Sequence, residues 1–106
     1  MARDIRFAGL DERMRRQVMQ TVQLIYNSYD KASAAEWDET VCDVLVADAD
    51  RASGRAAMAA ADALDVAVIA VTDDSTQTGY PSVSRNATAA SLTRLVRSLL
   101  TDKAAA

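Results

Sequence analysis

One short apolar run, in the stretch DVLVAD from Asp43 to Asp48, constrains the fold of this chain more than any other feature. Its four apolar residues, Val44 to Ala47, suit a strand covered on both faces, because a strand with one face in water alternates apolar and polar residues. The run stops at a carboxylate, Asp48. Since the carboxyl ends of strands line the functional crevice of open α/β sheets, Asp48 is the first candidate site residue.

Strand-like and helix-like segments alternate on both sides of this run. The other expected strands are Ile5–Leu10, the polar edge segment Tyr26–Ser33, the fully apolar Val66–Val71, and Pro81–Ser84. Helices are indicated where apolar residues recur every three or four positions. These residues are Met14, Val18, Val22 and Ile25; Ala57, Met58, Ala61 and Leu64; and Leu92, Leu95, Val96 and Leu99.

Three shorter features complete the expected elements. The segment Ala34–Val41 predicts a turn or two of helix, with Ser33 as its cap and Trp37 as its one large anchor. Thr88 is the expected cap of the last helix. The segment Asp73–Gly79 is polar and too short for an ordinary crossover helix.

This alternation predicts a single α/β domain with a core over about residues 4–101. Helices are expected on both faces of a doubly wound, mainly parallel five-stranded sheet with right-handed crossovers. The expected strand order is the flavodoxin-like (CheY-like) 2-1-3-4-5. The fourth helix of such a fold is expected to be missing at Asp73–Gly79.

Charge and composition argue against several classes of function. The formal net charge is −3 and the largest basic group is Arg13, Arg15 and Arg16, so we expect no binding to nucleic acid by this chain itself. The absence of histidine removes the commonest zinc ligand and the usual acid–base residue at neutral pH. No apolar stretch is long enough to span a membrane, so a cytoplasmic protein is expected. The single cysteine, Cys42, is expected to be a buried thiol.

Three carboxylates fall at the carboxyl ends of strands that are neighbours in this order. Asp11 and Glu12 follow the first strand, and Asp48 ends the third. Such hard oxygen ligands suit Mg²⁺, which takes one or two carboxylates together with a phosphate oxygen. Thr72, after the fourth strand, adds a hydroxyl, and Arg85, after the fifth, adds a cation. Together these residues are candidates to hold a phosphoryl group on Asp48.

Each of these residues also has a purely structural interpretation. Asp11 suits the N-cap of the following helix, and Glu12 suits its positively charged first turn. Asp48 or Asp50 suits a cap for the next helix, and Thr72 suits a turn. The cation after the fifth strand also fits an ordinary surface position.

The set of motifs resembles the receiver domain of two-component response regulators over most of the chain. DVLVAD matches that family's phosphoacceptor strand at Asp48, Asp11 and Glu12 match its acidic pair, and Thr72 in VIAVTDD matches its Ser/Thr. The final segment, RNATAASLTRLVRSLL, is similar to the family's Lys-Pro signature and the helix after it. The resemblance implies phosphorylation of Asp48, with Mg²⁺ on the three carboxylates and with Thr72 and Arg85 on the phosphoryl oxygens.

Several positions depart from the family pattern. The family's essential lysine falls on Arg85, whose planar fork differs from a compact ammonium. The following proline falls on Asn86, and the switch aromatic falls on Ser82, with Tyr80 nearby but out of register. The missing helix at Asp73–Gly79 removes much of the face through which such domains dimerise or signal. These departures indicate an atypical receiver, or pseudo-receiver.

Three functions are compatible with these features. The first is a regulatory module that acts through protein–protein contacts, with phosphorylation weakened or dispensable. It resembles the front-end domains of larger regulators, including pilus-assembly localisation proteins with an appended ATPase. Expected partners are proteins, either a second copy or an appended or separate output domain, with Arg94 and Arg97 beside the leucines of the last helix.

The second function is a working Mg²⁺-dependent phosphoacceptor at Asp48. The third is a small phosphohydrolase, because the pair Asp48 and Asp50 is similar to the aspartates of haloacid-dehalogenase phosphatases. The chain is short for that fold and its other motifs are not evident, so an enzyme is not expected.

Overall fold

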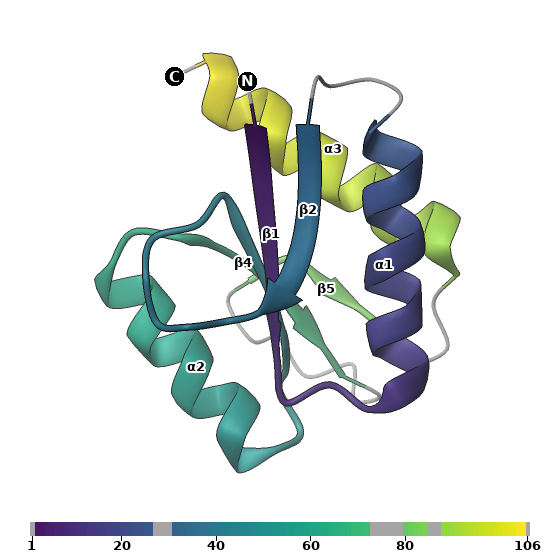
Figure 1. Cartoon of the computed structure of the whole chain (residues 1–106). Coiled ribbons are helices and arrows are strands. Elements are labelled where there is room, and N and C mark those ends of the chain that lie inside the picture. Colours follow the sequence, from purple (N-terminus) through teal and green to yellow (C-terminus); the bar gives the residue numbers. More distant parts are fainter. Residues whose placement is uncertain (1, 27–30, 73–79, 85–87, 106) are drawn as a thin grey trace.

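The computed structural model of the chain describes residues 2–26, 31–72, 80–84 and 88–105 (Figure 1). Five strands and three helices lie within these residues. Their bounds, in chain order, are β1 Ala2–Ala8, α1 Glu12–Tyr26, β2 Lys31–Glu36, β3 Val44–Asp48, α2 Ala52–Ala63, β4 Ala67–Val71, β5 Ser82–Val83 and α3 Ala89–Ala105.

The five strands form one parallel sheet of order β2-β1-β3-β4-β5. This arrangement confirms the predicted α/β fold and its flavodoxin-like strand order. The order places β3 between β1 and β4, at the centre of the sheet. Asp48 is in register with Val71 on β4, so the end of β3 and the residue after β4, Thr72, lie at the same carboxyl edge.

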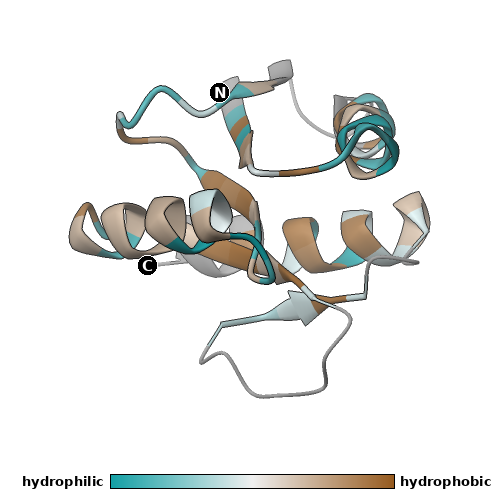
Figure 2. Ribbon diagram, turned by 90° about the horizontal axis from the view of Figure 1, so that it is seen from below, coloured by the Kyte–Doolittle hydropathy of each residue, from teal (hydrophilic) through white to brown (hydrophobic). Residues whose placement is uncertain are grey.

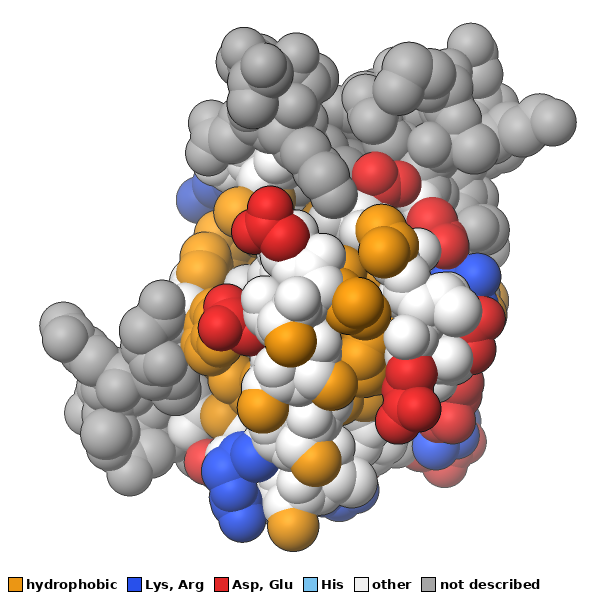
Figure 3. All heavy atoms as spheres, turned by 90° about the vertical axis from the view of Figure 1, so that its left-hand side faces the viewer, with side chains coloured by type: hydrophobic (Ala, Val, Ile, Leu, Met, Phe, Trp, Pro, Cys, Tyr) orange, Lys and Arg blue, Asp and Glu red, His pale blue; other side chains and the backbone are white. Residues whose placement is uncertain are grey.

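Helices cover both faces of this sheet. α1 and α3 pack together on one face, and among the described residues α2 is the only helix on the other (Figure 1). In Figure 2 the brown, hydrophobic central strands lie between these helices. Figure 3 faces the α2 side, where orange apolar side chains are visible along and beside that helix.

Side chains of the central strands alternate between two cores. The core against α1 and α3 contains large residues: Ile5, Phe7, Leu10, Met14, Val18, Val22, Val44, Val46, Ile69, Val71, Leu92 and Val96. The core against α2 is richer in small ones: Cys42, Leu45, Ala47, Ala57, Met58, Ala61, Val66, Val68 and Ala70. Because small side chains separate them, α2 and the sheet can approach closely.

The helix expected over Ala34–Val41 does not form, and that prediction is wrong. β2, Lys31–Glu36, takes its place and pairs with β1 along its length, so the expected edge strand exists but starts later than Tyr26–Ser33. The ladder continues beyond β2, because the backbone N–H of Trp37 donates to the carbonyl of Phe7 at 3.0 Å. The indole Nε1 of Trp37 donates to the Thr40 carbonyl at 2.9 Å, so this residue anchors a loop.

Other local predictions have mixed outcomes. The N-cap at Thr88 is confirmed, since its Oγ1 accepts the backbone N–H of Ser91 at 3.3 Å. The buried position of Cys42 is also confirmed. The prediction that Leu64 points inward is wrong, because this residue is 41% exposed. It is the C-cap of α2, and its backbone, at φ −93° and ψ 2°, is no longer α-helical.

Two predictions concern positions outside the described residues: the missing helix at Asp73–Gly79, and the lysine and proline positions at Arg85 and Asn86. Within the described part of the chain, no helix has both the length and the apolar character needed to cross a membrane.

Candidate functional site

Asp48 ends β3 with its side chain folded into a tight turn. The residue is 1% exposed. Its Oδ1 accepts the backbone N–H of Asp50 at 2.9 Å, and its Oδ2 lies 3.5 Å from Nε of Arg51. The first contact is an Asx turn, in which a carboxylate accepts the amide two residues further on. The carboxylate expected to face the crevice is therefore buried and bonded within its own turn.

Thr72, directly after β4, joins this turn through Asp50. The Oγ1 of Thr72 donates to Oδ1 of Asp50 at 2.9 Å, and its backbone N–H donates to the carbonyl of Val83 at 3.0 Å. Asp48, Asp50 and Thr72 thus form one hydrogen-bonded chain at the carboxyl edge of β3 and β4. Two of the predicted site residues, Asp48 and Thr72, are brought together, with Asp50 between them.

The first turn of α2 packs against the backbone of Asp48. A Cβ at Gly54 would lie 1.9 Å from the Asp48 carbonyl oxygen, so no side chain fits there. Gly9, in the loop after β1, has φ +67°, and a Cβ there would lie 2.9 Å from the Gly54 nitrogen. The loop after β1, the start of α2 and the end of β3 therefore meet backbone to backbone.

The N-cap of α2 is Arg51, and no side-chain capping hydrogen bond is formed there. The interpretation of Asp48 or Asp50 as the cap of this helix is therefore wrong. The two carboxylates bond to the turn and to Thr72 instead.

Asp11 and Glu12 are engaged at the start of α1. The Oδ1 of Asp11 accepts the backbone N–H of Met14 at 2.8 Å, which is the N-cap geometry of the structural interpretation. Glu12 is exposed and pairs with Arg16 one turn further on, at 2.8 Å between Oε1 and the guanidinium. Both acidic residues therefore have local partners on their own helix.

The predicted metal ligands do not come together as a group. Among the residues that the structure describes, no three His, Cys, Asp or Glu side chains are placed to hold one metal ion. The set Asp11, Glu12 and Asp48 thus does not fit the expected three-carboxylate magnesium site in this arrangement. Arg85, the expected phosphate contact, lies outside the described residues.

Comparisons with protein-family models, with curated proteins and with solved structures find no match for this chain. Its function must therefore be argued from its own residues.

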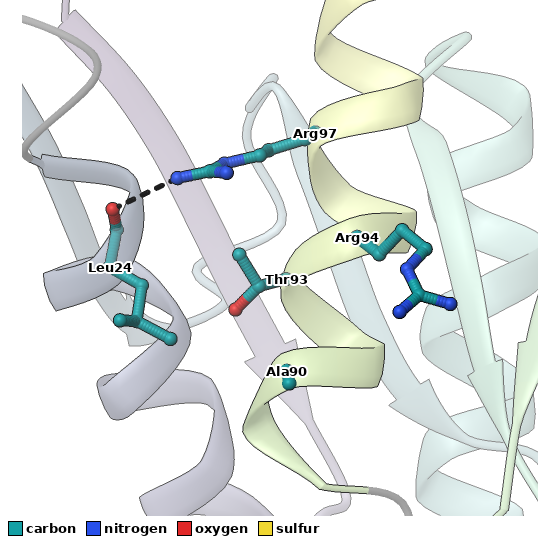
Figure 4. Close-up of a pocket in the computed structure, with 5 residues that line it drawn as sticks. All are labelled: Leu24, Ala90, Thr93, Arg94 and Arg97. Carbon is teal, nitrogen blue, oxygen red and sulfur yellow. Dashed lines mark hydrogen bonds between the residues drawn. The ribbon is translucent and has the colours of Figure 1, made fainter.

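A hollow of about 330 Å³ lies between α1 and α3, away from the carboxyl edge (Figure 4). Leu24, Ala90, Thr93, Arg94 and Arg97 line it. Arg97 reaches across to α1 and donates to the Leu24 carbonyl at 3.2 Å, whereas Arg94 extends along the other side of α3. Both arginines are exposed, so this hollow is an apolar surface with a basic rim.

Two ionisable groups with shifted pKa values lie on the α2 side of the molecule. The hydrogen bond to Asp4 raises the pKa of the Arg6 guanidinium on β1. In the loop after β2, hydrogen bonds from the side chain and backbone of Thr40 lower the pKa of the Asp38 carboxyl. Both shifts stabilise charges that are already present at neutral pH.

The bridging role of Asp50 was not predicted from the sequence. The signal that could have indicated it is the spacing of two aspartates in DAD at the end of an apolar strand. The first carboxylate closes an Asx turn onto the amide of the second, which leaves the second carboxylate available to the neighbouring strand. Here that neighbour is Thr72.

Proposed function

We propose that this chain is a receiver-like regulatory module that acts through protein–protein contacts, with phosphorylation of Asp48 weakened or dispensable. The observation that carries the proposal is the state of the Asp48 side chain, which is 1% exposed and has a partner on each carboxylate oxygen. A phosphoacceptor must present an oxygen in line with the incoming donor. At Asp48 the burial of the side chain and its contacts with Asp50 and Arg51 hinder the approach of such a donor.

Exposed surface on two sides of the molecule supports a docking role. On the α1–α3 side, Leu24 is 44% exposed beside the hollow with the arginine rim. Elsewhere, Leu64 at the end of α2 is 41% exposed, and Val41 in the loop before β3 is 67% exposed. Apolar surface flanked by cations, especially arginine, is typical of protein-binding sites. The proposed partners are a second copy of the chain or an output domain.

The proposed setting of this module is the cytoplasm. The single cysteine, Cys42, is a buried free thiol, which agrees with a reducing compartment.

Intact-mass spectrometry tests the phosphorylation half of the proposal. The chain is incubated with Mg²⁺ and a small acyl-phosphate donor, beside an Asp48→Asn variant as the matched control. We expect each protein to keep its own unmodified mass. A stoichiometric gain of one phosphoryl group that disappears in Asp48→Asn would overturn the proposal.

A pull-down with the purified chain tests the docking half. We expect capture of a protein partner that is weakened by a charge reversal at one of the two surfaces, for example Arg94→Glu with Arg97→Glu at the hollow. A chain that stays monomeric at high concentration and captures no partner would contradict docking.

A phosphoacceptor is the second candidate, and one observation favours it. Asp48 and Thr72 lie at the same carboxyl edge and are linked through Asp50, which is where a parallel α/β sheet places its functional groups. In this alternative Asp48 is the nucleophile, and the Thr72 hydroxyl leaves Asp50 to contact a phosphoryl oxygen. The intact-mass experiment decides between the two candidates.

A further inference from the structure

The outer face of α2 is apolar and lacks large side chains. The buried residues of this helix are Gly54, Ala57, Met58 and Ala61, which pack against the sheet. On the opposite face, Ala52, Ala56, Ala59 and Ala63 are all exposed. Their spacing of four, three and four residues is that of the a and d positions of a heptad, so they form one line along the helix.

A larger apolar side chain follows this line of alanines, because Leu64, at the end of α2, is 41% exposed. In Figure 3 orange side chains continue along and to either side of this helix.

The charges on α2 are arranged so that two copies of this helix are complementary when they run antiparallel. With Ala56 at position a and Ala59 at position d, the two g positions are Arg55 and Asp62. In an antiparallel helix pair the g positions of one helix lie beside the g positions of the other. Arg55 of each copy then faces Asp62 of the other, twice across the two-fold axis.

The side chain of Asp62 is available for such a pair. Asp62 is exposed, and its carboxylate makes no hydrogen bond or ion pair within the described part of the chain. Arg55 is also exposed, and its guanidinium donates to the Ala49 carbonyl at 3.1 Å while its other nitrogens can still donate.

From the apolar face and its charge order we infer that α2 binds α2 of a second copy of this chain, antiparallel, about a two-fold axis near Ala59. The exposed alanines allow the two helices to approach to the short end of the usual interaxial range, about 8 Å. Such a contact is isologous, so it closes into a dimer and does not propagate into a filament. A parallel arrangement would place Arg55 beside Ala60 of the other copy and would leave Asp62 without an opposite charge.

The size of the contact sets its strength. α2 has 12 residues and is therefore about 18 Å long, so the pair buries less than the roughly 800 Å² per partner of a standard stable interface. We therefore expect a weak dimer whose population rises with protein concentration, with a dissociation constant on the order of 0.1 mM.

Sedimentation equilibrium with charge-reversed variants tests this pairing. Arg55→Glu places like charges opposite each other twice in its homodimer, and Asp62→Arg does the same with the opposite sign. We expect each variant alone to dimerise at least about tenfold more weakly than the unaltered chain. An equimolar mixture of the two variants restores both opposite-charge pairs, so the mixture dimerises again.

The mixture also controls for folding. A variant that had unfolded could not dimerise with any partner, so rescue in the mixture shows that both variants are folded. Arg13→Glu makes the same charge change at an exposed position on α1, on the opposite face of the sheet, and leaves dimerisation unchanged. Three results would each overturn the inference: a chain that is monomeric at about 1 mM, a dimer insensitive to both single reversals, or variants that the mixture does not rescue.

This inference rests on the proposed docking role and names one partner for it. The two fail differently. Phosphorylation of Asp48 would overturn the proposed function and leave the α2 pairing intact, whereas a strictly monomeric chain would overturn the pairing and leave the α1–α3 hollow as a docking surface.

Discussion

Asp48 is buried at the end of a central strand because its carboxylate completes the turn that follows. The backbone of residues 48–51 leaves the sheet and enters α2 at once, so the Asp50 amide has no strand partner, and Oδ1 of Asp48 accepts it at 2.9 Å. The same carboxylate pairs with Arg51. A buried polar group with its partners in place stabilises a turn, and one that loses them is costly.

Removal of this carboxylate should therefore destabilise the protein. Asp48→Ala leaves the Asp50 amide and the Arg51 guanidinium without this acceptor, and we expect the free energy of unfolding to fall by about 1–3 kcal/mol. Asp48→Asn keeps an acceptor oxygen and should lose less. Urea denaturation of the three proteins measures the difference, and equal midpoints for Asp48→Ala and the unaltered chain would contradict a structural role.

Gly54 offers a second test at the same point of the fold. Glycine to alanine within a helix ordinarily stabilises by up to about 1 kcal/mol. At Gly54 the new Cβ would lie 1.9 Å from the Asp48 carbonyl oxygen, so we expect Gly54→Ala to destabilise by at least about 2 kcal/mol. Ser53→Ala, at the exposed neighbouring position, should stay within about 0.5 kcal/mol. A thermally stabilised Gly54→Ala variant would show that α2 does not pack this closely on β3.

At the scale of elements, strong apolar periodicity was enough to predict most of the chain, and β2 shows where it fails. Val44–Asp48 and the helix after it have unambiguous patterns, because both are buried over their whole length on one face or two. β2 reads KASAAE, which is short and alanine-rich, and alanine favours helix locally. Pairing with β1 overrides that preference, and only the tertiary partner reveals it.

The stability of the loop between β2 and β3 depends on pH, because this loop contains the Asp38 carboxyl. Hydrogen bonds from Thr40 lower the pKa of this carboxyl in the folded state, so their contribution to stability is present above the ordinary aspartate pKa and is lost as the pH falls through the lowered value. We expect Thr40→Ala to raise the pKa of Asp38 toward its ordinary value. A ¹³C titration of the Asp38 carboxyl in both proteins measures this shift, and identical titration curves would contradict it.

At the scale of the whole molecule, the strand order could be predicted because buried parallel strands and right-handed crossovers leave few topologies open. The candidate site was harder to predict. Because Asp48 and Thr72 stand at the ends of predicted strands, their place at one edge of the sheet was predicted correctly. The same pattern does not predict whether a short side chain there points into the crevice or into its own turn. Asp11 and Glu12 follow the neighbouring strand, yet the first caps α1 and the second pairs with Arg16.

The two faces of the sheet also differ in a way that composition alone does not indicate. α1 and α3 cover one face with large side chains, and a buried pair of hydroxyls, Thr21 and Thr93, lies 3.2 Å apart between them. On the other face the described helix is α2 alone, whose outer side remains exposed. This asymmetry places the inferred self-contact on α2 and leaves the hollow between α1 and α3 for another partner.

The most direct test of the central claim, that Asp48 supports the turn and does not take up phosphate, is an amide NMR titration with Mg²⁺ followed by beryllium fluoride. Bound at an aspartate, beryllium fluoride imitates a phosphoryl group. We predict no saturable shifts around Asp48, Asp50 and Thr72 at millimolar Mg²⁺, with or without the fluoride. Saturable shifts that cluster at these three residues, and that disappear in Asp48→Asn, would contradict the claim.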